Sequence, residues 1–249
     1  MPSRARRLPL RRWHLMACRA LLALCLSSTW AGAQEAIVSA EFADPTARYG
    51  HGVLGDAIEH GTLVVTFEDG SERRFVLPET SVFEDTSPRL ADITGDGSPE
   101  VIVVESNQTE GARLVVYAAQ GILVKTPYIG TRFRWLAPLG AADLDGDGAV
   151  ELAYIDRPHL AKTLRIWRYN DGEINEIATM PGLTNHRISE RDIAGGIRDC
   201  GDGYEMILAS ANWSKLVAIS FDGDRFTSTQ IGTDTSRAGF AQAMSCTAS

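Results

Sequence analysis

Short apolar runs separated by polar turns recur along the chain from residue 62 onward. The runs lie at residues 62–67, 73–77, 113–117, 164–167 and 215–219, and they are rich in β-branched and aromatic residues. Acidic, Asn and Gly clusters at residues 68–70, 170–172 and 222–224 stand between them. Helical periodicity is nearly absent, and short runs of this kind between turn residues are typical of strands in hairpins. The pattern therefore predicts an all-β architecture.

A longer repeat organises these strands. The nonapeptides Asp92–Glu100 (DITGDGSPE) and Asp143–Glu151 (DLDGDGAVE) are nearly identical and begin 51 residues apart, and a related Gly-rich stretch begins 49 residues later at Asp192. Each unit has room for four strands in about 50 residues, which is the size of a propeller blade. The spacing predicts a small β-propeller of about four to five four-stranded blades.

Oxygen-bearing residues alternate along both nonapeptides, and each nonapeptide runs directly into an apolar strand. Alternating oxygens suit Ca²⁺, which accepts roughly 6–8 oxygen ligands in a flexible loop. The second copy offers Asp143, Asp145, Asp147, the carbonyl of Ala149, and Glu151. The first copy offers Asp92, Thr94, Asp96, the carbonyl of Ser98, and Glu100. The second copy is the stronger candidate, because Thr94 replaces a charged ligand in the first.

Two other structures could account for loops of this composition, an EF-hand and a metal-free turn. An EF-hand loop needs a bidentate Glu at its twelfth position, where this chain has Val103 in one copy and Tyr154 in the other. The EF-hand is therefore excluded. Asp and Gly also form tight turns without any metal, but the repetition, with Glu at the same offset and a strand directly after it, favours a metal.

These units resemble the FG-GAP/VCBS repeats of integrin-α-like propellers and of many secreted bacterial proteins. The resemblance spans roughly residues 48–245, and the two acidic nonapeptides match it closely. It implies a β-propeller in which Ca²⁺ is structural, with one ion held by each nonapeptide and hence one or two ions in all. Residues 236–244 resemble a further innermost strand and residues 35–42 an isolated one, so we expect the two termini to share the closing blade.

The first 33 residues have the features of a secretory signal peptide. A run of arginines precedes a short apolar centre at residues 21–26, and Ala31-Gly-Ala33 fits a small-x-small cleavage site. The apolar run falls short of the ~20 residues that span a bilayer. We therefore expect a secreted or periplasmic domain at residues 34–249, without a transmembrane segment.

Removal of that segment changes the charge and the cysteine count. Residues 1–33 contain six arginines and no acid, which leaves 18 bases against 32 acids and a net charge of −14. Such a surface repels nucleic acid. Cys18 and Cys25 leave with the segment, so Cys200 and Cys246 remain. Two cysteines in an exported domain most often form a disulfide; two free thiols are the alternative.

Basic and aromatic residues stand where the expected inner strands begin, the region in which propellers usually bind their ligands. They are Arg48, His51, Arg132, Arg134, Trp135, His186, Arg187 and Arg237. Guanidinium groups bind carboxylate and sulfate through paired hydrogen bonds, so these residues predict an anionic ligand. The alternative is that they pair with nearby acids such as Glu84 and Glu190. The partner is an unidentified protein, glycan or small anion.

The sequence favours a binding role over catalysis. The serine hydrolase motif G-x-S-x-G and the zinc motif H-E-x-x-H are both absent. Glu190, Asp192 and Glu205 are candidates for a carboxylate pair in a propeller hydrolase or lyase acting on glycans. Propellers host both binders and enzymes. The sequence thus predicts an exported, calcium-stabilised β-propeller binding module, with the glycan enzyme as the alternative and no catalytic residue assigned.

Overall fold

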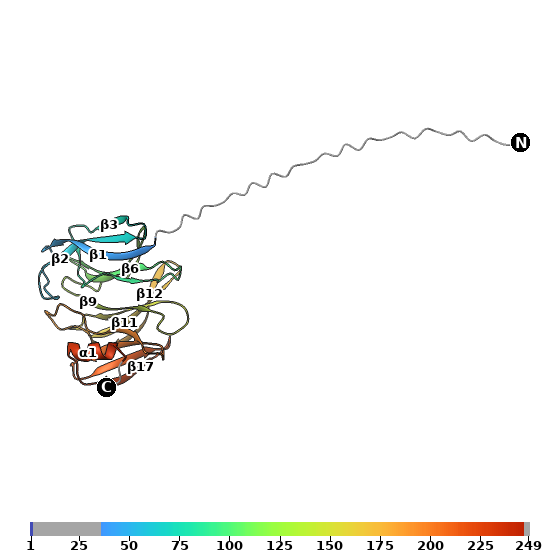
Figure 1. Cartoon of the computed structure of the whole chain (residues 1–249). Coiled ribbons are helices and arrows are strands. Elements are labelled where there is room, and N and C mark those ends of the chain that lie inside the picture. Colours follow the sequence, from blue (N-terminus) through green and yellow to red (C-terminus); the bar gives the residue numbers. More distant parts are fainter. Residues whose placement is uncertain (2–35, 247–249) are drawn as a thin grey trace. The chain divides into compact units, whose positions relative to one another are not determined.

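Antiparallel strands make up most of the described part of the chain, which is Met1 and residues 36–246 of this computed structural model (Figure 1). The predicted signal peptide lies outside the described residues apart from Met1. Residues 34–249 form one of the two compact units of the chain, and the fold below is that of this unit. The all-β prediction is confirmed, with one short helix in addition.

The first sheet has eight strands, and every pair in it is antiparallel. Its main path runs β1-β2-β4-β6-β7-β8, with β3 paired to β2 and β5 paired to β6. The strands are β1 (Ile37–Thr46), β2 (Glu59–Phe67), β3 (Glu72–Val76), β4 (Ser81–Phe83), β5 (Arg89–Ala91), β6 (Glu100–Asn107), β7 (Gly111–Ala118) and β8 (Gly121–Lys125). Two of the expected units are joined here, because β4 pairs with both β2 and β6.

The second and third sheets follow along the chain. The second is the four-stranded meander β9 (Leu136–Ala142), β10 (Glu151–Asp156), β11 (Thr163–Asn170) and β12 (Glu173–Pro181). The third contains β13 (Leu183–Thr184), β14 (Gly196–Asp199), β15 (Tyr204–Ser210), β16 (Leu216–Phe221) and β17 (Phe226–Gly232). Helix α1 (Arg237–Met244) packs against β14 and β15.

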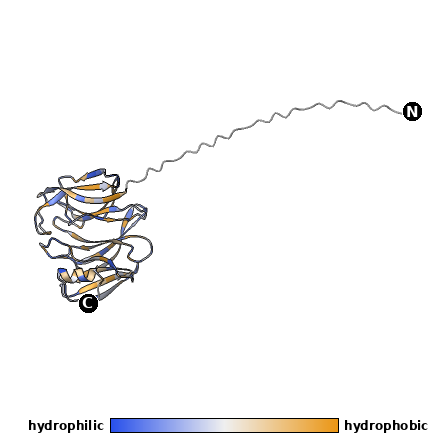
Figure 2. Cartoon of the chain, in the orientation of Figure 1, coloured by the Kyte–Doolittle hydropathy of each residue, from blue (hydrophilic) through white to orange (hydrophobic). Residues whose placement is uncertain are grey.

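The hydrophobic core lies between successive sheets. Side chains of β6 such as Ile102 pack with Leu152 and Tyr154 of β10 in one cluster, and Ile155 of β10 packs with Leu208 of β15 in the next. All residues of β10 are buried, whereas β12 at the sheet edge alternates between exposed and half-buried. Figure 2 shows hydrophobic residues along the strands and hydrophilic residues in many connecting loops. Strands covered on both faces by neighbouring sheets are apolar at successive positions, which explains the continuous apolar run of β10.

The prediction of a strand at residues 236–244 is wrong, because Arg237–Met244 form helix α1 and Ser236 is its N-cap. Ser236 caps the helix, and its hydroxyl accepts a hydrogen bond from the N–H of Gly239 at 3.2 Å. The segment RAGFAQAM has no β-branched residue and contains three alanines, the best helix former, directly after a favourable cap. Its local preferences therefore outweigh the apolar pattern that suggested a strand.

The expected closing blade is not formed by the termini. Strand β1 pairs with β2 in the first sheet, and α1 packs on the third. In Figure 1 these two elements lie at opposite ends of the unit, with the second sheet between them. Among the described residues the pairing gives three open sheets, so a closed ring of about four to five blades stays a prediction.

The predicted disulfide is confirmed. Cys200, directly after β14, is bonded to Cys246, just after α1, with their Cα atoms 5.6 Å apart. It joins the end of helix α1 to the third sheet. Within the described residues no helix is long and apolar enough to span a bilayer.

Candidate metal loops and a basic aromatic surface

The first acidic loop (residues 92–100) joins β5 to β6, and the second (residues 143–151) joins β9 to β10. The carboxylate of Asp92 accepts hydrogen bonds from the N–H groups of Gly95 at 2.7 Å and Gly97 at 2.9 Å. Asp143 accepts the equivalent bonds from Gly146 at 2.8 Å and Gly148 at 3.0 Å. The glycines have positive φ, which their lack of a side chain allows. Both loops therefore fold around their first aspartate.

The glutamate at the end of each loop is buried at the start of a strand. Glu100 accepts a hydrogen bond from the N–H of Ile93 at 2.9 Å, and Glu151 accepts the same bond from Leu144 at 2.9 Å. Burial raises the pKa of both carboxyl groups, and these backbone hydrogen bonds offset part of that effect. The two loops thus share one scaffold.

Carboxylates converge in the second loop. Asp143, Asp145 and Glu151 each offer an oxygen within 4.8 Å of the others, and theirs is the one acidic group of this kind in the described part of the chain. Three converging carboxylates are a donor set for a hard divalent cation. In the first loop Thr94 stands where the second has Asp145, and its acids do not form such a group among the described residues.

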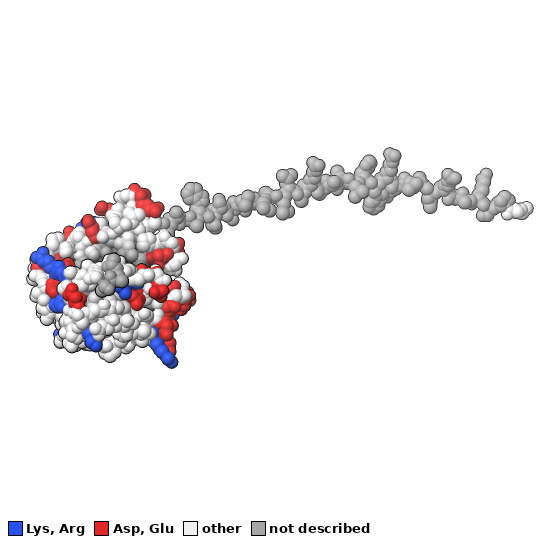
Figure 3. Space-filling model, turned by 60° about the horizontal axis from the view of Figure 1, so that its bottom comes forward, with Lys and Arg blue, Asp and Glu red and all other residues white. Residues whose placement is uncertain are grey.

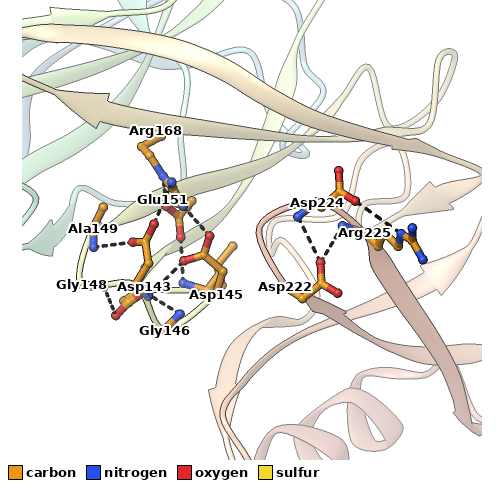
Figure 4. A network of polar contacts seen from close by, with 12 residues as sticks. Asp143, Asp145, Gly146, Gly148, Ala149, Glu151, Arg168, Asp222, Asp224 and Arg225 are labelled. Carbon is orange, nitrogen blue, oxygen red and sulfur yellow. Dashed lines mark hydrogen bonds and ion pairs between the residues drawn. The ribbon is translucent and has the colours of Figure 1, made fainter.

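Arg168 enters the second loop from β11, and the sequence analysis did not single it out. It lies directly opposite Glu151 in the β10–β11 ladder. Its guanidinium contacts Glu151 Oε1 at 2.5 Å, Asp145 Oδ2 at 2.6 Å and Asp147 Oδ2 at 3.0 Å (Figure 4). Burial acts to lower the pKa of Arg168, but its bonds to Asp145 and Glu151 outweigh this and raise it. The contact depends on the register of the β10–β11 ladder, and no pattern along the sequence reveals it.

Part of the predicted ligand surface comes together around a small cavity of about 30 Å³. Of the predicted residues, His51, Arg134 and Trp135 line it. The lining also includes Phe133, Arg157, Pro158, His159 and Leu160. His186 lies next to it, with its ring 4.9 Å from that of Trp135 and its Nδ1 3.1 Å from His159 Nε2. Arg157 and His159 come from the β10–β11 connection, which sequence reasoning had not connected to this surface.

The other predicted arginines have partners elsewhere. Arg48 donates to the carbonyl of Ser81 at 3.0 Å, and Arg237 forms an ion pair with Asp192. Arg187 lies over the ring of Trp213 at 3.7 Å and is 3.7 Å from Glu190. Pairing with a nearby acid, which was the alternative interpretation, therefore describes Arg187, Arg237 and also Arg48, which lies 3.4 Å from Glu79. His51 follows the same alternative, because its Nδ1 is 2.6 Å from Glu84 Oε1.

Two arginines on the loop at residues 131–134 remain exposed, and we call this segment the arginine loop. Neither Arg132 nor Arg134 has an ion pair with any described residue, and Arg132 lies 4.5 Å from the ring centre of Phe133. The N–H of Phe133 donates to Tyr49 Oη at 2.9 Å, and the carbonyl of Arg134 accepts from Ala112 N at 2.8 Å. The loop is therefore held in place while both arginine residues stay exposed.

A buried carboxylate orients the histidine beside this loop. Glu84 Oε1 is 2.6 Å from His51 Nδ1, and Glu84 Oε2 accepts from Ser106 Oγ at 2.5 Å. Burial raises the pKa of Glu84, and the bond to His51 offsets part of the rise. Burial and the neighbouring His186 lower the pKa of His159 to about 4, and burial lowers that of His186. At neutral pH His159 and His186 therefore add no positive charge to the cavity.

Two of the three acids considered for glycan chemistry, Glu190 and Asp192, line one cavity of about 250 Å³, and Glu205 is not among its lining residues. Glu190 lies near Arg187, Asp192 near Arg237, and Glu205 is 2.7 Å from Arg198. Each acid is thus bound to a different arginine. On the face shown in Figure 3, Asp and Glu side chains cover a larger area than Lys and Arg, in keeping with the acidic composition.

Comparisons with known proteins bear on this geometry. A comparison with curated protein sequences gives no match. Among solved structures, the crystal structure of the rhamnogalacturonan lyase YesW is 16% identical with a TM-score of 0.46, over 80% of this chain and 45% of that one. The exotype rhamnogalacturonan lyase YesX is 12% identical with a TM-score of 0.42, over 77% of this chain and 51% of that one. The chain thus spans about half the length of these two structures.

One family model matches the chain, that of the FG-GAP-like repeat, and it covers residues 92–154. The matched segment begins at the first acidic loop and contains the second. It is therefore the part of the chain from which the sequence predicted this family. The resemblance predicted from the sequence is thus confirmed over residues 92–154, which are similar to the FG-GAP-like repeat.

Proposed function

We propose that this protein is an exported, β-propeller-like binding module that recognises an anionic ligand through the arginine loop. The observation that carries the proposal is the state of Arg132 and Arg134. Both are exposed and have no ion pair among the described residues of a strongly acidic chain. Exposed guanidinium groups without partners attract anions, and an acidic surface around them disfavours large polyanions such as nucleic acid.

The surroundings of the loop suit a small acidic group attached to an apolar or sugar framework. Guanidinium forks bind carboxylate or sulfate through two parallel hydrogen bonds. The rings of His51 and Phe133 stack at 4.8 Å beside them and offer an apolar face. Because the loop is already held by Tyr49 and Ala112, binding costs little ordering entropy. A carboxylated or sulfated glycan is the ligand class that best fits this combination.

Calcium and export complete the proposal. We assign structural Ca²⁺ to the acidic loops, one or two ions in all, supported by the repeat family that the matched segment resembles. The disulfide between Cys200 and Cys246 supports an oxidising, secreted or periplasmic location, and residues 1–33 are the proposed signal peptide. A domain at residues 34–249 arranged as about four to five blades is part of the same proposal.

Binding measurements on matched variants test the role of the arginine loop. Sulfated and carboxylated oligosaccharides are titrated into the purified protein by calorimetry, alongside their uncharged counterparts. Arg134→Ala and Arg132→Ala should each weaken binding, while Arg225→Ala, which removes a similarly exposed arginine from the β16–β17 turn, should not. An unchanged affinity in Arg132→Ala and Arg134→Ala, or an absence of binding to every acidic oligosaccharide, rejects the proposal.

The second candidate is a hydrolase or lyase acting on glycans, and one observation favours it. His51 lines the cavity while its Nδ1 contacts the buried carboxylate of Glu84 at 2.6 Å. A carboxylate that fixes the orientation and tautomer of a histidine is a common arrangement for a general base. Turnover of the same oligosaccharides that is abolished in His51→Ala would favour this candidate over simple binding.

A further inference from the structure

Two differences in charged groups distinguish the second acidic loop and its neighbouring strand from the first, and they lie close together. At the third position the first loop has Thr94 and the second has Asp145. The other difference lies on the neighbouring strand. The β10–β11 register places Arg168 opposite Glu151, whereas the β6–β7 register, which pairs Val101 with Tyr117, places Ala118 beside Glu100. The second loop has therefore gained one carboxylate and one guanidinium relative to the first.

The guanidinium of Arg168 occupies the centre of the second loop. Each of its three nitrogens contacts a different carboxylate, at 2.5 Å for Glu151, 2.6 Å for Asp145 and 3.0 Å for Asp147. The Glu151 and Asp145 side chains are almost inaccessible to solvent, and that of Arg168 is 24% exposed. Charge-assisted hydrogen bonds of this kind are the strong ones, particularly where water is excluded.

The remaining carboxylate oxygens of the second loop are also engaged. Both oxygens of Asp143 accept backbone N–H groups, and so does the second oxygen of Asp145, Asp147 and Glu151. The oxygens left over by the backbone are those that contact Arg168. Asp145 and Glu151 would have to give up this guanidinium before they could ligate a divalent ion, so the loop as it stands does not fit Arg168 and the ion together.

The first loop has no equivalent cation. Among the described residues Asp92, Asp96 and Glu100 form no ion pair, and their partners are backbone N–H groups and the hydroxyl of Thr94. Its carboxylates also fail to converge as those of the second loop do. The related Gly-rich stretch that begins at Asp192 lacks an intact acidic loop, and there Glu205 is bound to Arg198 at 2.7 Å. The carboxylates thus converge in the second loop, where an arginine lies among them, and do not converge in the first loop, where there is none among the described residues.

We propose that Arg168 is the resident cation of the second acidic loop and keeps divalent ions out of it. The loop is then closed by a guanidinium that can never dissociate from the chain, and calcium dependence rests on the first loop. The predicted number of bound ions rests on the structural role of Ca²⁺ proposed above. The role of Arg168 in the metal-free protein does not depend on that proposal.

A neighbouring hairpin explains why a permanent cation is useful here. The β16–β17 turn lies against the second loop, so that a Cβ at Gly223 would be only 2.8 Å from Asp145 Oδ2 (Figure 4). The position of Asp145 therefore sets how closely the third sheet approaches the second. With Arg168 in place, this sheet-to-sheet contact keeps its geometry whether or not calcium is present.

The first test counts calcium ions by calorimetry in metal-stripped protein. The wild type should bind one ion, Asp92→Asn should bind none, and Arg168→Gln should bind two. A wild type that binds two ions, or an Arg168→Gln variant that binds no more than the wild type, overturns the exclusion of the ion by Arg168.

The second test is a double-mutant cycle in excess chelator, with Arg168→Gln and Asp145→Asn followed by thermal unfolding. Each single variant should lower the melting temperature, and the double variant should lose less than the sum of the two. The same cycle on Arg225 and Asp224, an exposed pair at 3.4 Å, should show no coupling. If neither the wild type nor any variant binds calcium, the proposed structural ion is wrong, and the double-mutant cycle alone decides the role of Arg168. If the losses in melting temperature of the two single variants simply add in the double variant, the proposed role of Arg168 is rejected.

Discussion

The backbone N–H of Phe133 donates a hydrogen bond to Tyr49 Oη at 2.9 Å, across 84 residues of sequence. Phe133 has a positive φ of 62°, which is uncommon for a residue with a side chain. Gly111 lies beneath the same loop, and a Cβ there would be 2.5 Å from the carbonyl of Thr131. A tyrosine hydroxyl and a glycine therefore hold a strained loop that presents two arginines.

Tyr49→Phe should weaken anion binding without removing an arginine. The variant loses one hydrogen bond to a half-buried N–H and leaves the ring packed, so the expected loss of stability is about 1 kcal/mol. Affinity for a sulfated or carboxylated oligosaccharide should fall because the arginine loop is no longer preorganised. Calorimetry measures this, and Tyr204→Phe, at an exposed tyrosine of the third sheet, is the control. Equal affinity in both variants would contradict the role of Tyr49.

Opening the disulfide should destabilise the third sheet while leaving the protein folded. The bond closes a loop with a sequence separation of 46 residues, for which chain entropy predicts a stabilisation of about 3–4 kcal/mol. Helix α1 has a second attachment, because Arg198 donates to the carbonyl of Ala243. The double variant Cys200→Ser, Cys246→Ser should therefore unfold cooperatively at a lower urea concentration. An unchanged midpoint would show that the bond constrains nothing.

The features that could be predicted from the sequence depend on local patterns. Strand positions follow from apolar runs between turn residues, and both acidic loops fold as their Asp and Gly positions suggest. The disulfide could be predicted because only two cysteines, Cys200 and Cys246, follow the predicted signal peptide. Residues 236–244 were misread because a short apolar segment fits a strand and a helix equally well, and Ser236 was not recognised as a cap.

Tertiary register explains what the sequence could not predict. Arg168 reaches the second loop only because β11 pairs with β10 in one particular register. Likewise His159 and Arg157 reach the cavity because the β10–β11 connection lies over Trp135, and the N–H of Arg157 donates to the Trp135 carbonyl at 3.0 Å. No spacing along the chain records these cross-strand contacts. The side chains that the sequence did not predict, Arg168, Arg157 and His159, are therefore those that reach a site from another strand or connection.

Removing divalent ions should lower the melting temperature, and Ca²⁺ should restore it. An ion that binds only the native state stabilises it by RT ln(1 + [L]/Kd), or about 2.7 kcal/mol at a hundred times Kd. Mg²⁺ should restore less, because it demands a tight octahedral shell that a flexible loop does not provide. Differential scanning fluorimetry with and without chelator measures both effects. Asp92→Asn, which disables the first loop, should be insensitive to calcium; a chelator-insensitive wild type would contradict the prediction.

Glu59 should make stability fall with rising pH. The residue is 3% exposed, and its Oε1 has no hydrogen-bond partner among residues 36–246. Burial raises its pKa to about 9, with the charges of Glu84, Asp56 and Asp85 adding to the effect. The folded state then holds a proton that the unfolded state, with its ordinary carboxyl pKa of 4.5, releases over the interval between these values. The stability contributed by the protonated carboxyl is therefore present below pH 4.5 and is lost as the pH rises toward 9.

Glu59→Gln separates this effect from other titrations, because glutamine keeps the shape and cannot ionise. Across the interval, each pH unit should cost the wild type up to about 1.4 kcal/mol relative to the variant. Urea unfolding at pH 5 and pH 8 should thus show that the free energy of unfolding of the variant rises relative to that of the wild type at the higher pH. Glu41→Gln, at an exposed position on β1, should change stability equally at both. A difference between wild type and Glu59→Gln that stays constant with pH would mean that Glu59 is ionised in the folded protein.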